Sequence, residues 1–272
     1  MSQTDQVTPL DLILHSNEVF KRVPAIFRAY LANRNPDEHD CIPRIFERTV
    51  EKYPNRPVIF YLDRVLTYQQ LNEEANRVAH YLRDQGLKRG QVVALVMHNR
   101  PEFLISLLAI SKVGACAALL NTAQRGKVLA YSINLVEPQM LIVGTELCDA
   151  LTEVRDQLTT LEEKNFFAVA DVDTQQQSGD TPQSYINLMA ASEHSPRTNL
   201  PETAAICRQD HYVYLYTSGT TGMPKAAITD HNRICSMFYL INVIKQLKPT
   251  DVYYVPLPLF HATGLLACWT GV

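Results

Sequence analysis

Short apolar segments that alternate with helical patterns constrain the fold of this chain more than any other feature. Four of them have the length of a strand and carry almost no polar side chain, namely Val92 to Met97, Ala115 to Leu120, Met140 to Val143 and Phe166 to Ala170. Helical spacing fills gaps between them, at Pro101 to Val113, Val128 to Val136 and Leu147 to Leu161. Strands that are apolar throughout are buried on both faces, as in parallel sheets covered by helices. We therefore predict an α/β fold with mostly parallel sheets, in which ligands bind at the carboxyl ends of the strands.

One helix is marked at both of its ends. Thr67 and Gln70 have the spacing of a capping box, in which each side chain bonds the backbone N–H of the other residue. Apolar residues then recur at helical spacing, at Leu71, Ala75, Val78 and Leu82. Gly86 follows, and glycine commonly ends a helix because it adopts positive φ angles. These signals predict a helix between Thr67 and Gly86.

The apolar stretch from Phe103 to Leu120 approaches the length of about 20 residues that crosses a bilayer. Lys112 stands near its middle, and a charged side chain there is costly in lipid. Pro101 stands where a helix would begin, and Gly114 precedes an alanine-rich run typical of a strand. We therefore expect a buried helix followed by a buried strand, and no membrane span.

The charge balance and the cysteines exclude other classes of function. With 25 basic and 28 acidic side chains the net charge is −3, so no general attraction draws the chain to nucleic acid, and no nucleic-acid partner is expected. The six cysteines lie far apart, without the close Cys and His spacing of a zinc site. They are typical of reduced thiols, and the polar N-terminus lacks the pattern of a secretory signal. We therefore predict no metal-ligating cluster and a cytoplasmic location.

The residues with the clearest chemistry form a loop rich in glycine and hydroxyl groups between two expected strands, Tyr212 to Tyr216 and Ala226 to Thr229. Such a loop can hold an anion in three ways. Glycines let the backbone turn its N–H groups inward, hydroxyls add donors, and a lysine supplies a mobile positive charge. The loop consists of Thr217, Ser218, Gly219, Thr220, Thr221, Gly222, Met223, Pro224 and Lys225. It predicts a polyphosphate site, with a plain polar hairpin as the alternative.

The loop differs from two other phosphate-binding motifs. A Walker loop has four residues between its glycines and a lysine directly after the second. Here two residues separate Gly219 from Gly222, and Met223 and Pro224 precede Lys225. The spacing also differs from the glycine pattern of a dinucleotide-binding turn. A different class of nucleotide site is therefore indicated.

Residues 216 to 225 resemble the signature phosphate loop of the adenylate-forming superfamily, which includes acyl-CoA synthetases, luciferases and the adenylation domains of peptide synthetases. Every fixed position of that signature is matched. Other segments fall where the superfamily has its N-terminal landmarks, namely Ile42 to Glu47, Leu66 to Leu71, Gly90 to Leu95 and Pro256 to His261. The resemblance implies that the α/β fold is the N-terminal part of the large domain of such an enzyme.

The segment from Ala118 to Gly126 is similar to the Leu-Asn-x-x-x-Arg-Gly segment of very-long-chain acyl-CoA synthetases, also called fatty acid transport proteins. The resemblance implies an ATP-dependent long-chain or very-long-chain fatty acid:CoA ligase. A CoA ligase for another carboxylate, such as a carnitine-like compound or a bile acid, fits the same loop. So does a non-catalytic protein that binds fatty acids for uptake. Fatty acid, ATP and CoA are the expected partners, and a homodimer stays open.

In this superfamily the carboxylate attacks the α-phosphate of ATP to give an acyl adenylate and pyrophosphate, and the CoA thiol then displaces AMP. The resemblance therefore implies ATP, Mg²⁺ and CoA, and catalytic roles for Lys225, Thr221 and His261. It assigns no metal ligand in this sequence. The nucleotide would contact the loop residues Thr217, Ser218, Gly219, Thr220, Thr221, Gly222 and Lys225.

His261 follows an expected strand, Val252 to Val255. By resemblance it lies beside the acyl carboxylate and the α-phosphate, with Gly264 permitting a close approach. A histidine with a purely structural role at the end of a strand is the alternative. His231, directly after Asp230, is instead expected to belong to the cap of a helix.

Two parts of the chain are predicted. Residues 39–272 are an incomplete N-terminal adenylation (AMP-binding) domain, because the superfamily continues with segments for adenine, ribose and Mg²⁺ and with a C-terminal lid. We expect such a piece to be inactive alone and to expose apolar surface. Residues 1–38 are an N-terminal extension with an amphipathic, basic stripe that includes Val19, Phe20, Val23, Phe27, Tyr30 and Leu31. We favour packing of this stripe on the main domain, with a peripheral membrane contact as the alternative.

Overall fold

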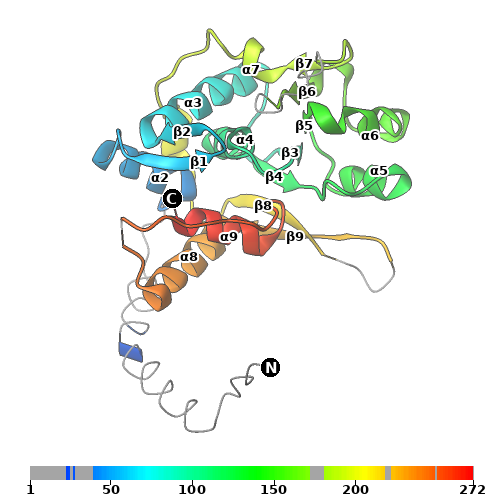
Figure 1. Cartoon of the computed structure of the whole chain (residues 1–272). Coiled ribbons are helices and arrows are strands. Elements are labelled where there is room, and N and C mark those ends of the chain that lie inside the picture. Colours follow the sequence, from blue (N-terminus) through cyan, green and yellow to red (C-terminus); the bar gives the residue numbers. More distant parts are fainter. Residues whose placement is uncertain are drawn as a thin grey trace, which may run out of the picture.

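The computed structural model describes residues 39–171, 181–217, 222–248 and 250–271, together with Val23, Pro24 and Phe27. Figure 1 shows a central sheet with helices on both of its faces. A separate two-stranded hairpin lies beside the helices of one face. This arrangement confirms the predicted α/β fold.

The described residues form one seven-stranded sheet in the order β7-β6-β5-β3-β4-β8-β9. Its strands are β3 (Val92–Val96), β4 (Cys116–Leu119), β5 (Met140–Gly144), β6 (Phe166–Val169), β7 (Ile186–Asn187), β8 (His211–Thr217) and β9 (Lys225–Asp230). Neighbouring strands are parallel from β7 to β8, and β9 alone is antiparallel to its neighbour. The carboxyl ends of the parallel strands therefore meet at one edge, where sheets of this kind bind ligands.

Two apolar cores cover the two faces of the sheet. The helices are α2 (Ile42–Lys52), α3 (Tyr68–Asp84), α4 (Pro101–Lys112), α5 (Gly126–Asn134), α6 (Cys148–Thr152), α7 (Leu188–Ala191), α8 (His231–Lys245) and α9 (Ala262–Gly271). On one face Val93 and Leu95 pack with α2, α3, α4, α8 and α9, and on the other Ala94 and Val96 pack with α5 and α6. Successive strand residues point to opposite faces, so each strand is apolar throughout because both faces are buried.

The hairpin β1 (Pro57–Tyr61) and β2 (Arg64–Thr67) leads directly into α3. Both bonds of the predicted capping box are present, because the Thr67 hydroxyl accepts from the Gln70 N–H at 3.2 Å and the Gln70 side chain accepts from the Thr67 N–H at 2.8 Å. At the other end Gly86 has φ +99°, and its N–H and that of Leu87 donate back to the last turn of the helix. Local signals therefore set both ends of α3, as predicted.

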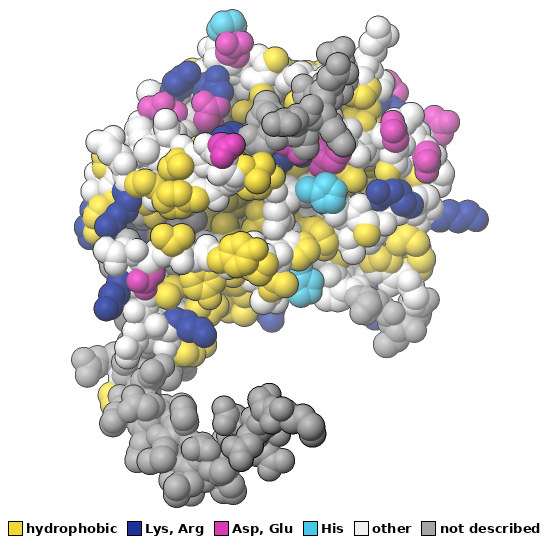
Figure 2. Space-filling view, viewed as in Figure 1, with side chains coloured by type: hydrophobic (Ala, Val, Ile, Leu, Met, Phe, Trp, Pro, Cys, Tyr) yellow, Lys and Arg dark blue, Asp and Glu magenta, His cyan; other side chains and the backbone are white. Residues whose placement is uncertain are grey.

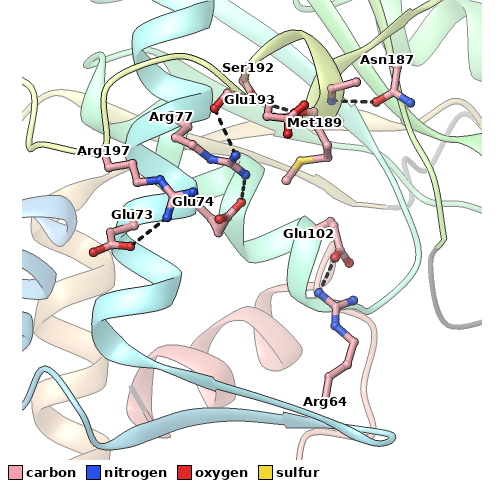
Figure 3. Close-up of polar contacts among 11 residues, drawn as sticks. Arg64, Glu73, Glu74, Arg77, Glu102, Asn187, Met189, Ser192, Glu193 and Arg197 are labelled. Atoms are coloured by element: carbon pink, nitrogen blue, oxygen red, sulfur yellow. Dashed lines mark hydrogen bonds and ion pairs between the residues drawn. The ribbon is translucent and has the colours of Figure 1, made fainter.

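The long connection before β8 packs along α3. Figure 3 shows the Arg77 guanidinium between the Glu74 carboxylate and the carbonyl of Glu193, and Arg197 reaching Glu73. Further along α3, the His80 Nε2 lies 2.9 Å from the carbonyl oxygen of Thr198. This cover explains why one side of α3 buries polar residues, since their partners come from the connection.

The predicted helical stretch from Leu147 to Leu161 is broken in the structure. It contains α6 and a short 3₁₀ turn at Arg155–Gln157, and another 3₁₀ turn, Thr145–Leu147, ends at its first residue. The Asn134 side chain donates to the carbonyl of Gln157 at 2.7 Å and accepts from the N–H of Thr159 at 3.2 Å. The helix α6 already ends at Thr152, and the Asn134 bonds then hold the backbone at Gln157 and Thr159 in a connection that is not an α-helix.

The predicted strand at Val252 to Val255 is also not formed. The segment has no regular structure, and no described strand pairs with it. Val252 is 75 % exposed and Tyr254 is 84 % exposed. Apolar composition alone does not make a strand, because a strand also needs a neighbour for its backbone hydrogen bonds.

Of the predicted N-terminal stripe, only Val23 and Phe27 belong to the described residues. Their side chains are 48 % and 58 % exposed, so these two are not packed in the core. The rest of the stripe lies outside the described residues, and its packing or membrane contact stays a prediction. Among the helices that are described, none has the length and hydropathy that a membrane span needs.

Lys112 is fully buried near the end of α4, within the long apolar stretch from Phe103 to Leu120. Its ammonium pairs with the Glu47 carboxylate of α2, and its Nζ lies 3.4 Å from the Oδ1 of Asn199. Burial lowers the pKa of Lys112, and the nearby Glu47 opposes this by favouring the charged form. The pair joins α2 to α4 inside the core.

We expect Glu47→Ala to lower the free energy of unfolding by about 3–5 kcal/mol, because it leaves the Lys112 ammonium buried without its carboxylate. The double variant Glu47→Leu with Lys112→Met should recover most of this loss, since no unpaired charge is then buried. Urea unfolding at pH 7 measures both. As a control, Glu73→Ala breaks the exposed pair with Arg197 and should cost less than about 1 kcal/mol. Equal losses for Glu47→Ala and Glu73→Ala would contradict the importance of the buried pair.

Candidate active site

The expected phosphate loop connects β8 to β9 at the carboxyl edge of the sheet. Thr217 is the last residue of β8 and pairs with Lys225, the first residue of β9. Because β8 runs parallel to β4, this turn stands at the same edge as the ends of β3 and β4. The structure therefore brings Thr217 and Lys225 together at the place where sheets of this kind bind ligands.

The described part of the loop is open to solvent. The side chains of Thr217 and Lys225 are both exposed. Gly222 has φ +83°, a conformation that side chains with a Cβ rarely adopt, and there is free space where a Cβ would be. Glycine is thus needed here for its backbone conformation. Ser218, Gly219, Thr220 and Thr221 lie outside the described residues, so their contacts with a nucleotide stay predictions.

The segment that resembles very-long-chain acyl-CoA synthetases forms the turn after β4, next to β8. The Asn121 side chain accepts from the N–H of Ala123 at 2.9 Å. The Arg125 guanidinium donates to the carbonyls of Thr122 and Gln124, each at 2.7 Å. Gly126 follows with φ +52° at the start of α5. The Asn, Arg and Gly of this segment therefore fix the shape of the turn.

Arg100 is a buried charge at this edge that the sequence analysis missed. Its guanidinium donates to the Glu146 carboxylate at 2.9 Å and to the carbonyl of Val169 at 2.8 Å, and Asp171 lies 3.8 Å away. The charge is thus committed to the ends of β5 and β6, so it stabilises the sheet edge. Its position three residues after the predicted strand Val92 to Met97 was the signal that could have found it.

His261 lies between a turn and the start of α9. Its N–H donates to the carbonyl of Pro258 at 3.1 Å, and its carbonyl accepts from the N–H of Leu265 at 3.0 Å. Its side chain is exposed, and its Nδ1 accepts from the N–H of Thr263 at 3.4 Å. When Nδ1 accepts, the neutral ring carries its proton on Nε2. His261 therefore presents an N–H donor toward solvent.

Gly264 permits a close approach, as expected, but to the protein's own backbone. A Cβ at this position would stand 2.2 Å from the carbonyl oxygen of Pro258 and 2.9 Å from that of Leu257. Glycine therefore lets the first turn of α9 lie against this segment.

The same segment is joined to the end of β3. The Asn99 side chain donates to the carbonyl of Leu257 at 2.8 Å and accepts from the N–H of Leu259 at 2.8 Å. His261 thus follows a segment that is attached to the carboxyl edge, the edge that also carries Thr217 and Lys225. The sequence analysis missed Asn99, although it too follows a predicted strand.

Two cavities are lined by described residues, and neither lining includes Thr217 or Lys225. One, of about 810 Å³, lies between the β1–β2 hairpin and residues 250–255, and its lining includes Phe60, Leu62 and Tyr254. A smaller one, of about 330 Å³, lies between α2 and α8. Figure 2 shows hydrophobic side chains gathered across the middle of the surface that faces the viewer. Apolar surface is thus exposed, as the sequence analysis expected.

His231 is a core residue at the start of α8. The preceding Asp230 caps the helix by accepting from the N–H of Arg233 at 2.7 Å. The His231 ring is fully buried, its Nδ1 accepts from the N–H of Ile42 at 3.3 Å, and its centroid lies 4.8 Å from that of Tyr212. Burial lowers the pKa of His231 to about 3, against a small opposing effect of Asp210. This histidine therefore stays neutral and supports the fold.

Five of the six cysteines are buried, and none is in a disulfide. Burial raises the pKa of Cys41 to about 11, and that of Cys116, Cys148, Cys235 and Cys268 to about 12. Thiols of this kind stay protonated and are weak nucleophiles and metal ligands. Within the part of the chain that the structure describes, no three His, Cys, Asp or Glu side chains come together as a metal site.

We expect the stability of the protein to fall between pH 7 and pH 5 partly because of His231. The unfolded chain binds a proton at His231 below a pKa of about 6.5, whereas the folded protein does so only near 3, so stability decreases as the pH falls. The loss from this group is roughly 2 kcal/mol over that range. Urea unfolding should show that His231→Gln loses less stability than the wild type over the same range.

The matched control for this experiment is His194→Gln, since His194 is exposed and stays in water in both states. It should leave the pH dependence of unfolding unchanged. The same pH dependence in the wild type and in His231→Gln would contradict the neutral buried ring.

The chain is similar in sequence to a family of nucleotide-binding enzymes and to fatty-acid CoA ligases. Residues 46–272 match the family described as "AMP-binding enzyme". The chain is 29 % identical over 273 residues to "Medium/long-chain-fatty-acid--CoA ligase FadD6" of Mycobacterium tuberculosis, covering 97 % of this chain and 42 % of that protein. It is 34 % identical over 227 residues to "Long-chain fatty acid transport protein 1" of Rattus norvegicus, covering 83 % and 34 %. The chain thus spans less than half the length of these curated relatives.

Solved structures share the fold. The anthranilate CoA ligase AuaEII, in complex with anthranoyl-AMP, matches with a TM-score of 0.69 and 24 % identity over 88 % of this chain and 45 % of that chain. A putative long-chain-fatty-acid CoA ligase from Rhodopseudomonas palustris matches with a TM-score of 0.73 and 21 % identity over 85 % and 54 %. The mostly parallel sheet and its covering helices are therefore those of the N-terminal part of adenylate-forming enzymes.

Proposed function

Because the chain belongs to the family of AMP-binding enzymes, we propose that it binds ATP at the loop between β8 and β9 and belongs to a fatty acid:CoA ligase. The observation that carries this proposal is the pairing of Thr217 with Lys225 at the carboxyl edge of the sheet. The pairing presents an exposed ammonium and hydroxyl on either side of a loop with the family's phosphate signature. That arrangement supports polyphosphate binding by donors and a positive charge.

In the proposed reaction a carboxylate attacks the α-phosphate, the bond to the β-phosphate breaks, and pyrophosphate leaves with an added negative charge. Lys225, Thr221 and the backbone N–H groups of the loop would stabilise that charge as it develops. The thiol of CoA would then attack the acyl carbonyl and release AMP. We propose His261 as the donor at the carboxylate and the α-phosphate, since its side chain is exposed and directly follows the segment that Asn99 attaches to the carboxyl edge.

Mg²⁺, when bound, would neutralise phosphate charge. Proteins usually hold it with one or two carboxylates together with substrate phosphates. The described residues bring no set of three carboxylate, imidazole or thiolate side chains together. No described residue is therefore assigned as a ligand of Mg²⁺.

Long-chain fatty acids are the proposed substrates. The relatives named above support this class, because one is called a medium/long-chain-fatty-acid CoA ligase and another a long-chain fatty acid transport protein. The turn from Asn121 to Gly126 adds the segment found in the very-long-chain branch. A ligase for another carboxylate and a fatty-acid uptake protein without turnover are the alternatives. A cytoplasmic location, membrane contact and a homodimer stay predictions.

We expect Lys225→Ala or Thr221→Ala to slow adenylation by about 100- to 1,000-fold in the full-length protein, because each removes a donor to the leaving pyrophosphate. ATP–pyrophosphate exchange in the presence of a fatty acid measures this step alone. Lys164→Ala is the control, because Lys164 is a surface lysine that pairs with Glu162 away from the loop. Exchange at the wild-type rate in both loop variants would refute the role of the loop.

A panel of acids in an AMP-release assay on the full-length protein distinguishes the three functions. We expect AMP release with CoA and a rate that depends on acyl chain length, with long chains fastest. A preference for a polar acid would establish the other ligase, and no AMP with any acid would establish the uptake protein. The first of these outcomes would overturn the proposed substrate class, and the second would overturn the proposed ligase activity.

A further inference from the structure

Asn99 makes the same side-chain contact with residues 257–259 that Asn134 makes with residues 157–159. In each case the amide N–H donates to the carbonyl of one residue and the amide oxygen accepts from the N–H two residues later. For Asn99 both distances are 2.8 Å, and they join the end of β3 to a segment about 160 residues away. Since both ends of the amide are used, the segment is fixed in direction as well as in position.

Asn99 is itself held firmly. It stands three residues after the end of β3 and directly precedes Arg100, whose buried guanidinium bonds Glu146 and the carbonyl of Val169. Pro101 then begins α4. The backbone on either side of Asn99 is therefore fixed by the core, and its amide is a rigid support for what it contacts.

The supported segment leads within two residues to His261. Leu259 is 6 % exposed and anchors the segment in the core, whereas Leu257 is 44 % exposed. The His261 N–H donates to the carbonyl of Pro258, between the two residues that Asn99 holds. A shift of residues 257–259 would therefore move His261 directly.

We propose that Asn99 is a positioning residue for adenylation, which holds residues 257–259 so that the Nε2 N–H of His261 meets the reacting carboxylate and α-phosphate. The inference rests on the function proposed above and adds a residue to it. Asn99 acts through His261, because both ends of its amide are used by the backbone of residues 257 and 259. Its effect on the reaction therefore depends on the presence of the His261 ring.

The first experiment tests the contact in the 272-residue chain, by hydrogen exchange of single amides measured with NMR. Asn99→Ala should speed the exchange of the Leu259 N–H at least tenfold, because it removes the acceptor. Asn99→Asp keeps an acceptor but loses the donor to Leu257, so its effect should be smaller. Asn134→Ala is the matched control, which should speed exchange at Thr159 and leave Leu259 unchanged. Unchanged exchange of Leu259 in Asn99→Ala overturns the proposal.

The second experiment tests the catalytic consequence in the full-length protein, by ATP–pyrophosphate exchange. Asn99→Ala should lower kcat about 10- to 100-fold with little change in the KM for ATP, because the loop from Thr217 to Lys225 is untouched. In a His261→Ala background the same substitution should have almost no further effect. Asn134→Ala should leave the rate unchanged in both backgrounds.

The outcomes separate this proposal from the one it rests on. An equal loss from Asn99→Ala with and without the His261 ring would show a general structural role and overturn the positioning role. ATP–pyrophosphate exchange at the wild-type rate in His261→Ala would instead remove the catalytic role assigned to His261. That conclusion would hold whatever the hydrogen exchange of the Leu259 N–H shows. Loss of activity in Lys225→Ala is independent of both results and reports on the phosphate loop alone.

Discussion

Burial of one parallel sheet on both of its faces is the constraint on which the rest of this structure depends. Each inner strand places alternate side chains into two separate cores. A shift of one residue would move every side chain of the strand from one core into the other, so the register is fixed. This fixes the register of β3, β4 and β8, and with it the position of their carboxyl ends. The polar residues that follow these strands are thereby brought to one edge, whatever their separation in the sequence.

Most charged and polar groups at that edge serve the scaffold. The guanidiniums of Arg100 and Arg125 are used to hold strand ends and a turn, and the Asn99 amide holds a distant segment. Lys225 and His261 have exposed side chains, whereas Arg100 is buried and the exposed Arg125 is already bonded to the carbonyls of its own turn. The division suits a site for a charged ligand, since the supporting charges are already paired and the exposed groups are left for the ligand.

Local features of the fold were predictable from the sequence, whereas features that depend on distant partners were not. The ends of α3 follow from Thr67, Gln70 and Gly86, which act within one turn of the helix. The strand predicted at 252–255 is wrong because pairing depends on a neighbour. The helix predicted from Leu147 to Leu161 ends at Thr152, and the backbone beyond it is bonded by the Asn134 side chain at Gln157. At the site, the phosphate loop was visible as a run of specialised residues. The role of Asn99 depends on residues about 160 positions away, and no spacing in the sequence indicates it.

The position of β8 in the sheet has a consequence for how the protein folds. β8 pairs with β4, almost a hundred residues earlier in the chain, whereas β3, β4 and β5 are joined by short crossovers. Closing such a long loop costs entropy before any contact compensates for it, so pairings of this kind form slowly. The strand that carries the phosphate loop is thus expected to dock onto a sheet that has already assembled, and the nucleotide site is completed late on the folding pathway.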